Sequence, residues 1–384
     1  MSVREVNRLT STWLAQSSDE APGVVSAAGL WPLLALLAHA ADEPGRSELA
    51  EAVGLPAGQC ADAAGELLRL MDEVPGVDAA LGVWAQAAAR IDPEWAASLP
   101  PGAWGELTGR PATDQPVLDT WASEKTRGLI ERFPVEVRAD TGLVLATAVA
   151  LRTTWTAPFA DEPLRPRAGA WAGQRLAGLT RTTGELDDLR VADTPAGALT
   201  VTRVEGDNGL DVYLALGESG RAAADVLPAA ISVLAGDGPV VNGAEILDGH
   251  GEAPGVERVR AQRRSLAVTS TRFTVRSDHD LHAHAKLFGL ETVSRGPGGH
   301  FSRIGAVPMR VDQARQSAVA IFSATGFEAA AVTAVGMRMV SMPVYRERGL
   351  RVTYDRPFGF VAVHRATGMA LFAGWVGTAE RAER

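Results

Sequence analysis

Hydrophobic positions follow a helical period near the start of this chain. Residues 30–38 are apolar at nearly every position, which is typical of a helix buried on all sides in a large core. Ser47 and Glu48 open a further helix, which Gly54 and Pro56 stop. Residues 61–71 form a third, amphipathic segment. Roughly the first 70 residues are therefore predicted to be helical.

The two-residue period of β-strands takes over after these helices. Strands are predicted at residues 79–85, 143–151, 198–204, 211–216, 265–275, 306–311, 318–322, 350–354, 359–363 and 369–375. Helices are predicted between them at residues 117–130, 222–234 and 279–288. Helices first and then many strands, without regular βα alternation, indicate an α+β fold. With no repeat or linker in the sequence, we expect one domain over residues 1–384.

Composition narrows the class of protein. Hydrophobic residues make up 46 % and charged residues 22 %, the ordinary globular balance. Cys60 is the single cysteine, which excludes an intramolecular disulfide, and we expect it buried in a helix. The net charge of −9 argues against binding to nucleic acid or to an anionic membrane. The short basic run at residues 260–264 is therefore interpreted as a solvated strand end or loop.

The start of the chain and its hydropathy bear on its location. Residues 2–8 are polar and helix-like, unlike a signal peptide, and no apolar run reaches the roughly 18 residues of a membrane span. A soluble, cytoplasmic protein is predicted. Only two lysines occur, so arginine carries nearly all of the positive charge. This bias toward arginine suggests a GC-rich genome.

The most unusual segment covers residues 326–343. It is nearly uncharged, with small β-compatible residues at 329–335, and an unstructured connection of this length is usually functional. As a strand it would alternate faces. One face would carry Phe327, Ala329, Ala331, Thr333, Val335 and Met337, and the other Glu328, Ala330, Val332, Ala334, Gly336 and Arg338. A surface helix is the alternative, because Glu-Ala-Ala-Ala also favours a helix.

This segment resembles the hinge of a serpin reactive loop, with Gly326 followed by Glu328-Ala329-Ala330-Ala331-Val332-Thr333. Other segments are similar to the same family, in the right order. They are Val24-Val25-Ser26, residues 118–130 around Trp121, residues 146–159 with Trp155 and Pro158-Phe159, Asp355-Arg356-Pro357-Phe358, and residues 371–376. The chain thus resembles the serpin family, as a bacterial-type intracellular member.

The resemblance implies three β-sheets surrounded by helices, with a long exposed reactive loop at about residues 324–348. It also implies a serine protease inhibitor and not an enzyme. The protease would cut between Val340 and Ser341, form an acyl-enzyme, and be trapped as the loop inserts into the main sheet. A valine before the cut suits an elastase- or subtilisin-like protease. The same resemblance implies a monomer without cofactor or metal.

The sequence departs from the family at the hinge and at the region where the sheet opens. Phe327 stands where a small residue is usual, and its ring would overpack the sheet on insertion or need a compensating pocket. Ala324 and Thr325 replace an acidic pair. The sheet-opening region comprises Ser26, Thr147, Trp155 and Gln316, with Gly29, Thr147 and Gln316 where Ser, Asn and His are usual. Thr147 and Gln316 could hydrogen-bond together.

Two functions stay open from the sequence. One is a suicide inhibitor of a serine protease, and the other is a non-inhibitory binding or scaffold protein of the same fold. A metal site in residues 278–284, which hold three histidines, is less favoured than a helix start capped by Asp278 or Asp280. No hydrolase elbow, phosphate-binding loop or dinucleotide motif occurs.

Overall fold

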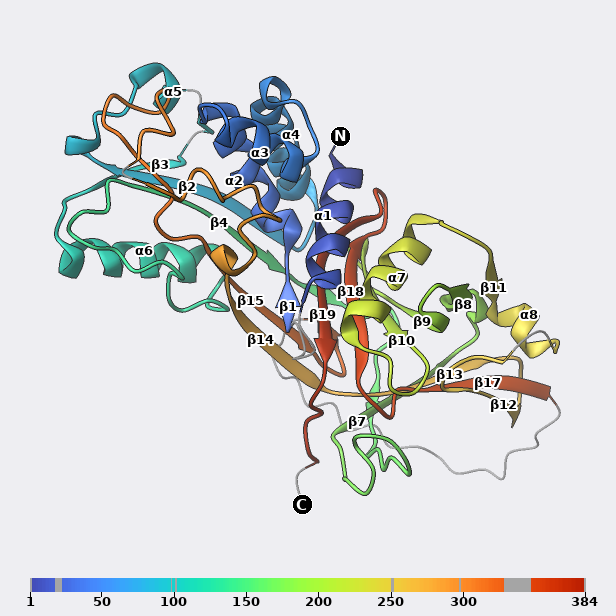
Figure 1. The fold of residues 1–384 in the computed structure, drawn as a ribbon. Coiled ribbons are helices and arrows are strands. Elements are labelled where there is room, and N and C mark those ends of the chain that lie inside the picture. Colours follow the sequence, from blue (N-terminus) through green and yellow to red (C-terminus); the bar gives the residue numbers. More distant parts are fainter. Residues whose placement is uncertain are drawn as a thin grey trace. The chain divides into compact units, whose positions relative to one another are not determined.

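The computed structural model describes residues 2–17, 23–97, 99–100, 102–249, 252–296, 298–327 and 347–382 (Figure 1). The chain divides into two compact units, each assembled from separate segments. The first holds Met1–Thr10, Ser26–Leu151 and Ser277–Val319. The second holds Ser11–Val25, Arg152–Arg276 and Ala320–Arg384. α1 (Val3–Ala15) begins in the first unit and ends in the second.

Three predicted helices of the first unit are confirmed. They are α2 (Ala27–Ala40), α3 (Gly45–Val53) and α4 (Cys60–Glu73), the last preceded by the 3₁₀ turn η1 (Ala57–Gln59). Most of α2 is buried, as its apolar run predicts. Gly54 ends α3 in the left-handed conformation (φ 83°), which glycine adopts without strain. Cys60 is buried at the start of α4, and burial raises the pKa of its thiol to about 11.

A three-stranded sheet in the order β3, β2, β4 completes much of the first unit. Its elements are β2 (Val77–Gln86), η2 (Ala87–Ala89), α5 (Pro93–Ala97), β3 (Trp104–Leu107) and β4 (Leu143–Leu151). β2 and β4 confirm two predicted strands. α6 (Pro111–Lys125) packs on this sheet through an aromatic cluster of Trp84, Trp121 and Phe133.

The boundaries predicted for α6, residues 117–130, are wrong at both ends. The helix starts at Pro111 because proline is tolerated in the first turn, where its missing N–H has no helical partner. It ends at Thr126, whose Oγ1 accepts from the backbone N–H of Ile130 at 3.0 Å. Gly128 follows in the left-handed conformation (φ 86°). The last five residues of the predicted segment, 126–130, thus form the helix cap and the turn that follows it.

The second unit contains a seven-stranded sheet covered by α7 (Ala223–Ala235), which lies against β18 and β10 (Figure 1). In pairing order its strands are β1 (Val24–Val25), β19 (Met369–Val376), β18 (Phe358–His364), β10 (Leu210–Leu216), β9 (Gly197–Glu205), β8 (Leu189–Thr194) and β11 (Val240–Asn242). η3 (Leu186–Asp188) and α8 (Gly243–Leu247) flank β8 and β11 in sequence. Four predicted strands, at residues 198–204, 211–216, 359–363 and 369–375, are confirmed here.

A five-stranded sheet also belongs to the second unit. Its strands pair in the order β12 (Val256–Ala261), β17 (Glu347–Thr353), β13 (Leu266–Thr271), β7 (Gly178–Thr183) and β6 (Ala160–Asp161). A further four-stranded sheet has the order β14 (Phe273–Asp280), β15 (Arg315–Phe322), β16 (Gly326–Phe327) and β5 (Thr153–Thr154). The described strands therefore form four sheets and not three. The chain passes from β4 to β5 at Arg152, and these two strands belong to different sheets.

Three other predicted elements need correction. Residues 265–275 form two strands, because the chain changes sheet at Arg272, between β13 and β14. Residues 306–311 form no strand, since Pro308 cannot donate to a ladder. Residues 279–288 are not an α-helix: β14 continues to Asp280, which caps the 3₁₀ turn η4 (Leu281–His284) by accepting from the His282 N–H at 3.0 Å.

The residues that the structure describes contain neither a candidate membrane span nor a clustered metal site. In that part of the chain, no helix is long and apolar enough to cross a membrane. The same residues contain no group of three or more His, Cys, Asp and Glu side chains placed to hold a metal ion.

Candidate functional site

The predicted hinge begins in a tight turn that we call the hinge turn, residues 323–327. The Ser323 hydroxyl accepts from the Gly326 N–H at 3.2 Å, and the Ser323 N–H donates to the Gly326 carbonyl at 2.9 Å. The chain thereby reverses, and β16 pairs antiparallel with β15 through Phe322 and Phe327. Gly326 and Phe327 thus already occupy a strand position next to β15.

The other edge of β16 pairs with β5, where Gly326 faces Thr154 and Phe327 faces Thr153. The approach is so close that a Cβ on Gly326 would lie 2.4 Å from the Thr153 carbonyl oxygen. Real Cβ atoms do not approach an oxygen so closely, so glycine is required at this position.

All three carbonyl groups before Gly326 are held by the segment that follows β5. The Trp155 indole Nε1 donates to the Ser323 oxygen at 3.0 Å, and the Trp155 backbone N–H donates to the Thr325 oxygen at 2.9 Å. The Phe159 N–H donates to the Ala324 oxygen at 2.8 Å. Ala324 and Thr325 stand where an acidic pair was expected, and here their backbone groups make the contacts.

Phe327 is buried, with 2 % of its surface exposed. Its ring centroid lies 6.1 Å from that of Phe360, which in turn lies 5.0 Å from Phe273. Phe273 stacks on Phe322 at 5.1 Å, and Trp155 lies 5.0 Å from Phe322. At its position in β16 the ring of Phe327 is thus accommodated by aromatic packing.

The turn around Asn208, between β9 and β10, supports β5 along the edge that does not pair with β16. Asn208 accepts from the Thr153 hydroxyl at 2.6 Å and donates to the Arg152 carbonyl at 2.8 Å. The turn itself is fixed by Arg365, which lies 2.6 Å from the buried carboxylate of Asp211. The strand that receives the hinge is thus held by hydrogen bonds on the side away from β16.

A buried arginine lies under Phe159. The Arg181 guanidinium stacks over the Phe159 ring at 4.9 Å and donates to the carbonyls of Ala157 and Arg203 at 3.2 and 2.8 Å. Burial lowers the pKa of Arg181, and the negative charge of Asp188, 4.0 Å away, opposes that shift. Sequence reasoning missed Arg181, because an arginine on an alternating strand looks like an exposed residue.

The polar residues of the sheet-opening region are close together in the first unit, and we call Ser26, Thr147 and Gln316 the polar cluster. The Gln316 side chain accepts from the Ser26 N–H at 2.9 Å and donates to the Ser26 carbonyl at 2.8 Å. The Thr147 hydroxyl donates to the Gly29 carbonyl. The two side chains thus bind the first turn of α2 separately, and not each other as the sequence suggested.

Packing explains why residue 29 is a glycine, which the sequence did not reveal. A Cβ at this position would lie 3.1 Å from Cγ2 of Val149 on β4 and 3.3 Å from the Ser26 hydroxyl. The Ser26 hydroxyl is itself occupied, since it accepts from the Gly29 N–H at 3.1 Å and caps α2. A serine side chain at residue 29 would need either Val149 or the cap to move.

Trp155, which the sequence assigned to the sheet-opening region, contacts the hinge turn. The remaining predicted residues lie outside the described part of the chain. They are the hinge residues Glu328, Ala329, Ala330, Ala331, Val332 and Thr333, and the residues of the predicted scissile bond, Val340 and Ser341.

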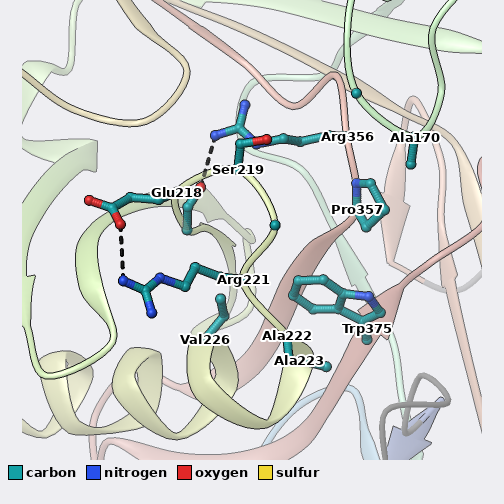
Figure 2. Close-up of a pocket in the computed structure, with 13 residues that line it drawn as sticks. Ala170, Glu218, Ser219, Arg221, Ala222, Ala223, Val226, Arg356, Pro357 and Trp375 are labelled. Carbon is teal, nitrogen blue, oxygen red and sulfur yellow. Dashed lines mark hydrogen bonds and ion pairs between the residues drawn. The ribbon is translucent and has the colours of Figure 1, made fainter.

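A separate pocket of about 390 Å³ opens in the second unit (Figure 2). Trp375, Pro357 and Val226 form its apolar wall. Both of its arginines are bound within the protein: Arg356 donates to the Gly217 carbonyl at 2.8 Å, and Arg221 lies 3.2 Å from Glu218. With these charges already paired, we assign the pocket no ligand.

Comparison with known proteins agrees with this geometry. The family model described as Serpin (serine protease inhibitor) matches residues 7–168 and 255–378, which is more than half of the chain. A rice protein named serpin-Z6C (Oryza sativa subsp. japonica) is 24 % identical over 355 residues, covering 86 % of this chain and 79 % of the rice protein.

Solved structures share the fold over nearly the whole chain. A cleaved serpin 42Da has a TM-score of 0.75 at 16 % identity and covers 99 % of this chain and 98 % of its own. A complex of thyroxine-binding globulin with thyroxine has a TM-score of 0.73 at 13 % identity, with 99 % of each chain covered. A native protease nexin-1 with heparin has a TM-score of 0.72 at 17 % identity, with 98 % of each covered. The predicted α+β serpin fold is confirmed, and the chain belongs to the serpin family.

Proposed function

We propose that this chain is a serine protease inhibitor and not an enzyme. The protease cuts the loop between Val340 and Ser341 and is trapped as an acyl-enzyme when the loop inserts into the main sheet. We treat residues 1–384 as a single serpin domain whose reactive loop covers about residues 324–348. The observation that carries the proposal is the position of Gly326 and Phe327 as a short strand between β15 and β5.

The buried ring of Phe327 supports this mechanism. Since Phe327 points into the core, strand alternation would turn Ala329, Ala331 and Thr333 inward when the loop inserts. All three side chains are small, so they can enter a packed sheet without overpacking. The bulky ring is already accommodated before cleavage and adds no obstacle to the later steps.

The partner we propose is a protease with elastase- or subtilisin-like specificity, because Val340 suits a small apolar pocket. The chain would act as a monomer, without cofactor, in the cytoplasm of a bacterial-type host. The proposed origin rests on the arginine bias of the composition. Neither nucleic acid nor membrane is proposed as a partner.

A second candidate is a non-inhibitory serpin that binds a partner or serves as a scaffold. Its support is the altered polar cluster, in which Thr147 and Gln316 both tie the start of α2 to neighbouring segments. A structural relative is a thyroxine-binding globulin solved with thyroxine, so the fold is compatible with a binding protein. The two candidates differ in whether a covalent protease complex forms.

The test is incubation with elastase- and subtilisin-type proteases, followed by denaturing electrophoresis and mass spectrometry. We expect a complex that survives denaturation, with cleavage after Val340. Thr333→Arg puts a charge on the inward face and should turn the protein into a substrate. Its matched control, Val332→Arg, carries the same charge on the outward face and should still form the complex.

Clean cleavage of the unaltered protein without any complex would reject the inhibitor proposal for the proteases tested. A melting scan of that cleaved form then separates the two candidates further. A large rise in the melting temperature would mean that the loop still inserts, only too slowly to trap the protease. An unchanged melting temperature would favour the binding or scaffold function.

A further inference from the structure

The edge of the five-stranded sheet carries four exposed arginines, which we call the arginine edge. They are Arg260 at the end of β12, Arg263 and Arg264 just after it, and Arg348 on β17. Strand pairing puts Arg260 directly opposite Arg348. The cluster stands out because the whole chain has a net charge of −9.

Two like charges directly opposite each other on paired strands destabilise the sheet. Elsewhere in the same pair of strands the charges are complementary, with Glu257 opposite Arg351. Arg264 lies 3.5 Å from Asp248, and half of each side chain is exposed. Within the described residues, no ion-pair partner is found for Arg260, Arg263 or Arg348. Among the residues that the structure describes, the charge of the arginine edge is therefore mostly uncompensated.

Protection of the sheet edge explains only part of this pattern. Charged residues on an edge strand discourage pairing with other chains, and this accounts for Arg260 on β12. Arg348 lies on β17, where it pairs with β12, and the pairing of β17 with β13 begins two residues later, at Leu350. Edge protection calls for charge at the open edge, but it does not call for a second positive charge directly opposite the first on the paired strand.

The covalent chain limits how far the arginine edge can be from the loop. Arg348 is seven residues after Ser341 in the sequence. A fully extended chain spans at most about 3.6 Å per residue, so roughly 25 Å separates their Cα atoms at most. A protease has a comparable radius, so a molecule bound across the bond between Val340 and Ser341 comes close to Arg348.

We propose that the arginine edge is a docking surface for an acidic region of the protease that cleaves the loop. The proposal rests on the proposed function for the position of the cleaved bond. Complementary charges steer two proteins together and raise the association rate, and salt weakens this effect. The arginine edge would thus select, among proteases that accept Val340, those with an acidic surface beside the active site.

The test compares Arg260→Glu/Arg348→Glu with the control Arg69→Glu/Arg132→Glu, which changes the net charge equally at exposed arginines of the first unit. The probe is a subtilisin-type protease whose active-site rim is acidic, with a charge-reversed variant of that protease as its counterpart. The readout is the second-order rate of loop cleavage, measured by electrophoresis at 50 mM and 1 M salt.

At low salt, we expect the arginine-edge variant to be attacked about tenfold more slowly by the acidic protease. The control should change by less than twofold, the charge-reversed protease should show the opposite preference, and 1 M salt should abolish the difference. Arg260→Gln/Arg348→Gln gives a smaller loss of the same sign and serves if the glutamate variant does not fold. Equal effects in variant and control would overturn the proposal.

The cleavage rate reports docking whether or not a covalent complex forms. Salt-dependent cleavage without a complex would reject the inhibitor function and keep the docking surface. A covalent complex that forms at a rate independent of the arginines would support the inhibitor function and reject the docking surface. Loss of retention on a sulfated polysaccharide, with unchanged cleavage rates, would assign the arginine edge to a polyanion and overturn the protease proposal.

Discussion

The hinge turn and the polar cluster are held by different forces, although both depart from the residues usual in serpins. In the hinge turn, the departure is a large ring, Phe327, and buried aromatic packing accommodates it. In the polar cluster, the departures are Thr147 and Gln316, and hydrogen bonds to the backbone of the first turn of α2 accommodate them. The first departure is thus stabilised through a single large side chain, and the second departures are stabilised through several modest hydrogen bonds.

This difference sets the expected size of each substitution effect. Removing a buried ring leaves a cavity that a packed core cannot fill. Removing one hydrogen bond of a half-buried group costs less, because water can replace the lost partner. The following changes test that ranking.

The largest effect is expected for Phe327→Ala, which should lower the free energy of unfolding by about 3–5 kcal/mol. The ring packs against Phe360 and is 2 % exposed, so its loss leaves a cavity. Urea titration provides the measurement. Phe327→Leu is the matched control, with an expected loss of about 1.5 kcal/mol. A loss below 1 kcal/mol for alanine would mean that packing does not hold the hinge turn.

Gln316→Leu should lower the free energy of unfolding by about 2 kcal/mol, since two hydrogen bonds with Ser26 are lost. Gln316→Glu keeps an acceptor for the Ser26 N–H but cannot donate to the Ser26 carbonyl, so about half of that loss is expected. Thermal and urea unfolding of the two variants side by side measure the difference. Equal losses would show that the donor half of the contact contributes little.

Trp155→Phe should cost about 1 kcal/mol, because it removes the indole N–H that binds the Ser323 carbonyl and keeps most of the ring. Hydrogen exchange at the amides of Trp155 and Phe159 should also speed up, since both donate to the hinge turn. Trp375→Phe, on β19, is the control for ring size. Unchanged exchange at both amides would contradict this account of how the hinge turn is held.

Thr147→Val should cost about 0.5 kcal/mol, because the hydroxyl is lost at constant shape and the Gly29 carbonyl lies within a helix. A loss as large as that of Gln316→Leu would mean that Thr147, and not Gln316, dominates the polar cluster. Urea titration at one temperature is sufficient, provided that both variants are measured together.

The smallest effect is expected from pH, because neither region contains a titratable side chain. Burial lowers the pKa of His364 at the end of β18, so the unfolded chain takes up its proton first as the pH falls. Stability should therefore decrease from pH 7 down through the folded pKa, and His364→Gln should reduce that slope. The slope should be the same in Phe327→Ala and Gln316→Leu. A changed pH dependence of stability in either variant would show that the hinge turn or the polar cluster is coupled to the titration of His364.

Most of the secondary structure, and the family, could be predicted from local patterns along the chain. Local periodicity located α2, α4, β4 and β10, because a helix and a strand bury side chains at different spacings. The ordered motifs around Trp121, Trp155 and Phe358 identified the serpin fold. These signals are local, so they need no knowledge of which elements pack together.

How the departures from the family are accommodated depends on contacts between distant segments, which became visible in the folded structure. Phe327 packs against Phe360, which continues through Phe273 to Phe322, and no spacing rule links residues that lie on separate strands so far apart in sequence. Pairing between β12 and β17 brought Arg260 opposite Arg348, and it turned a short basic run into a charged surface. Contacts of this kind depend on the register of strands that meet only after folding, which local sequence patterns do not specify.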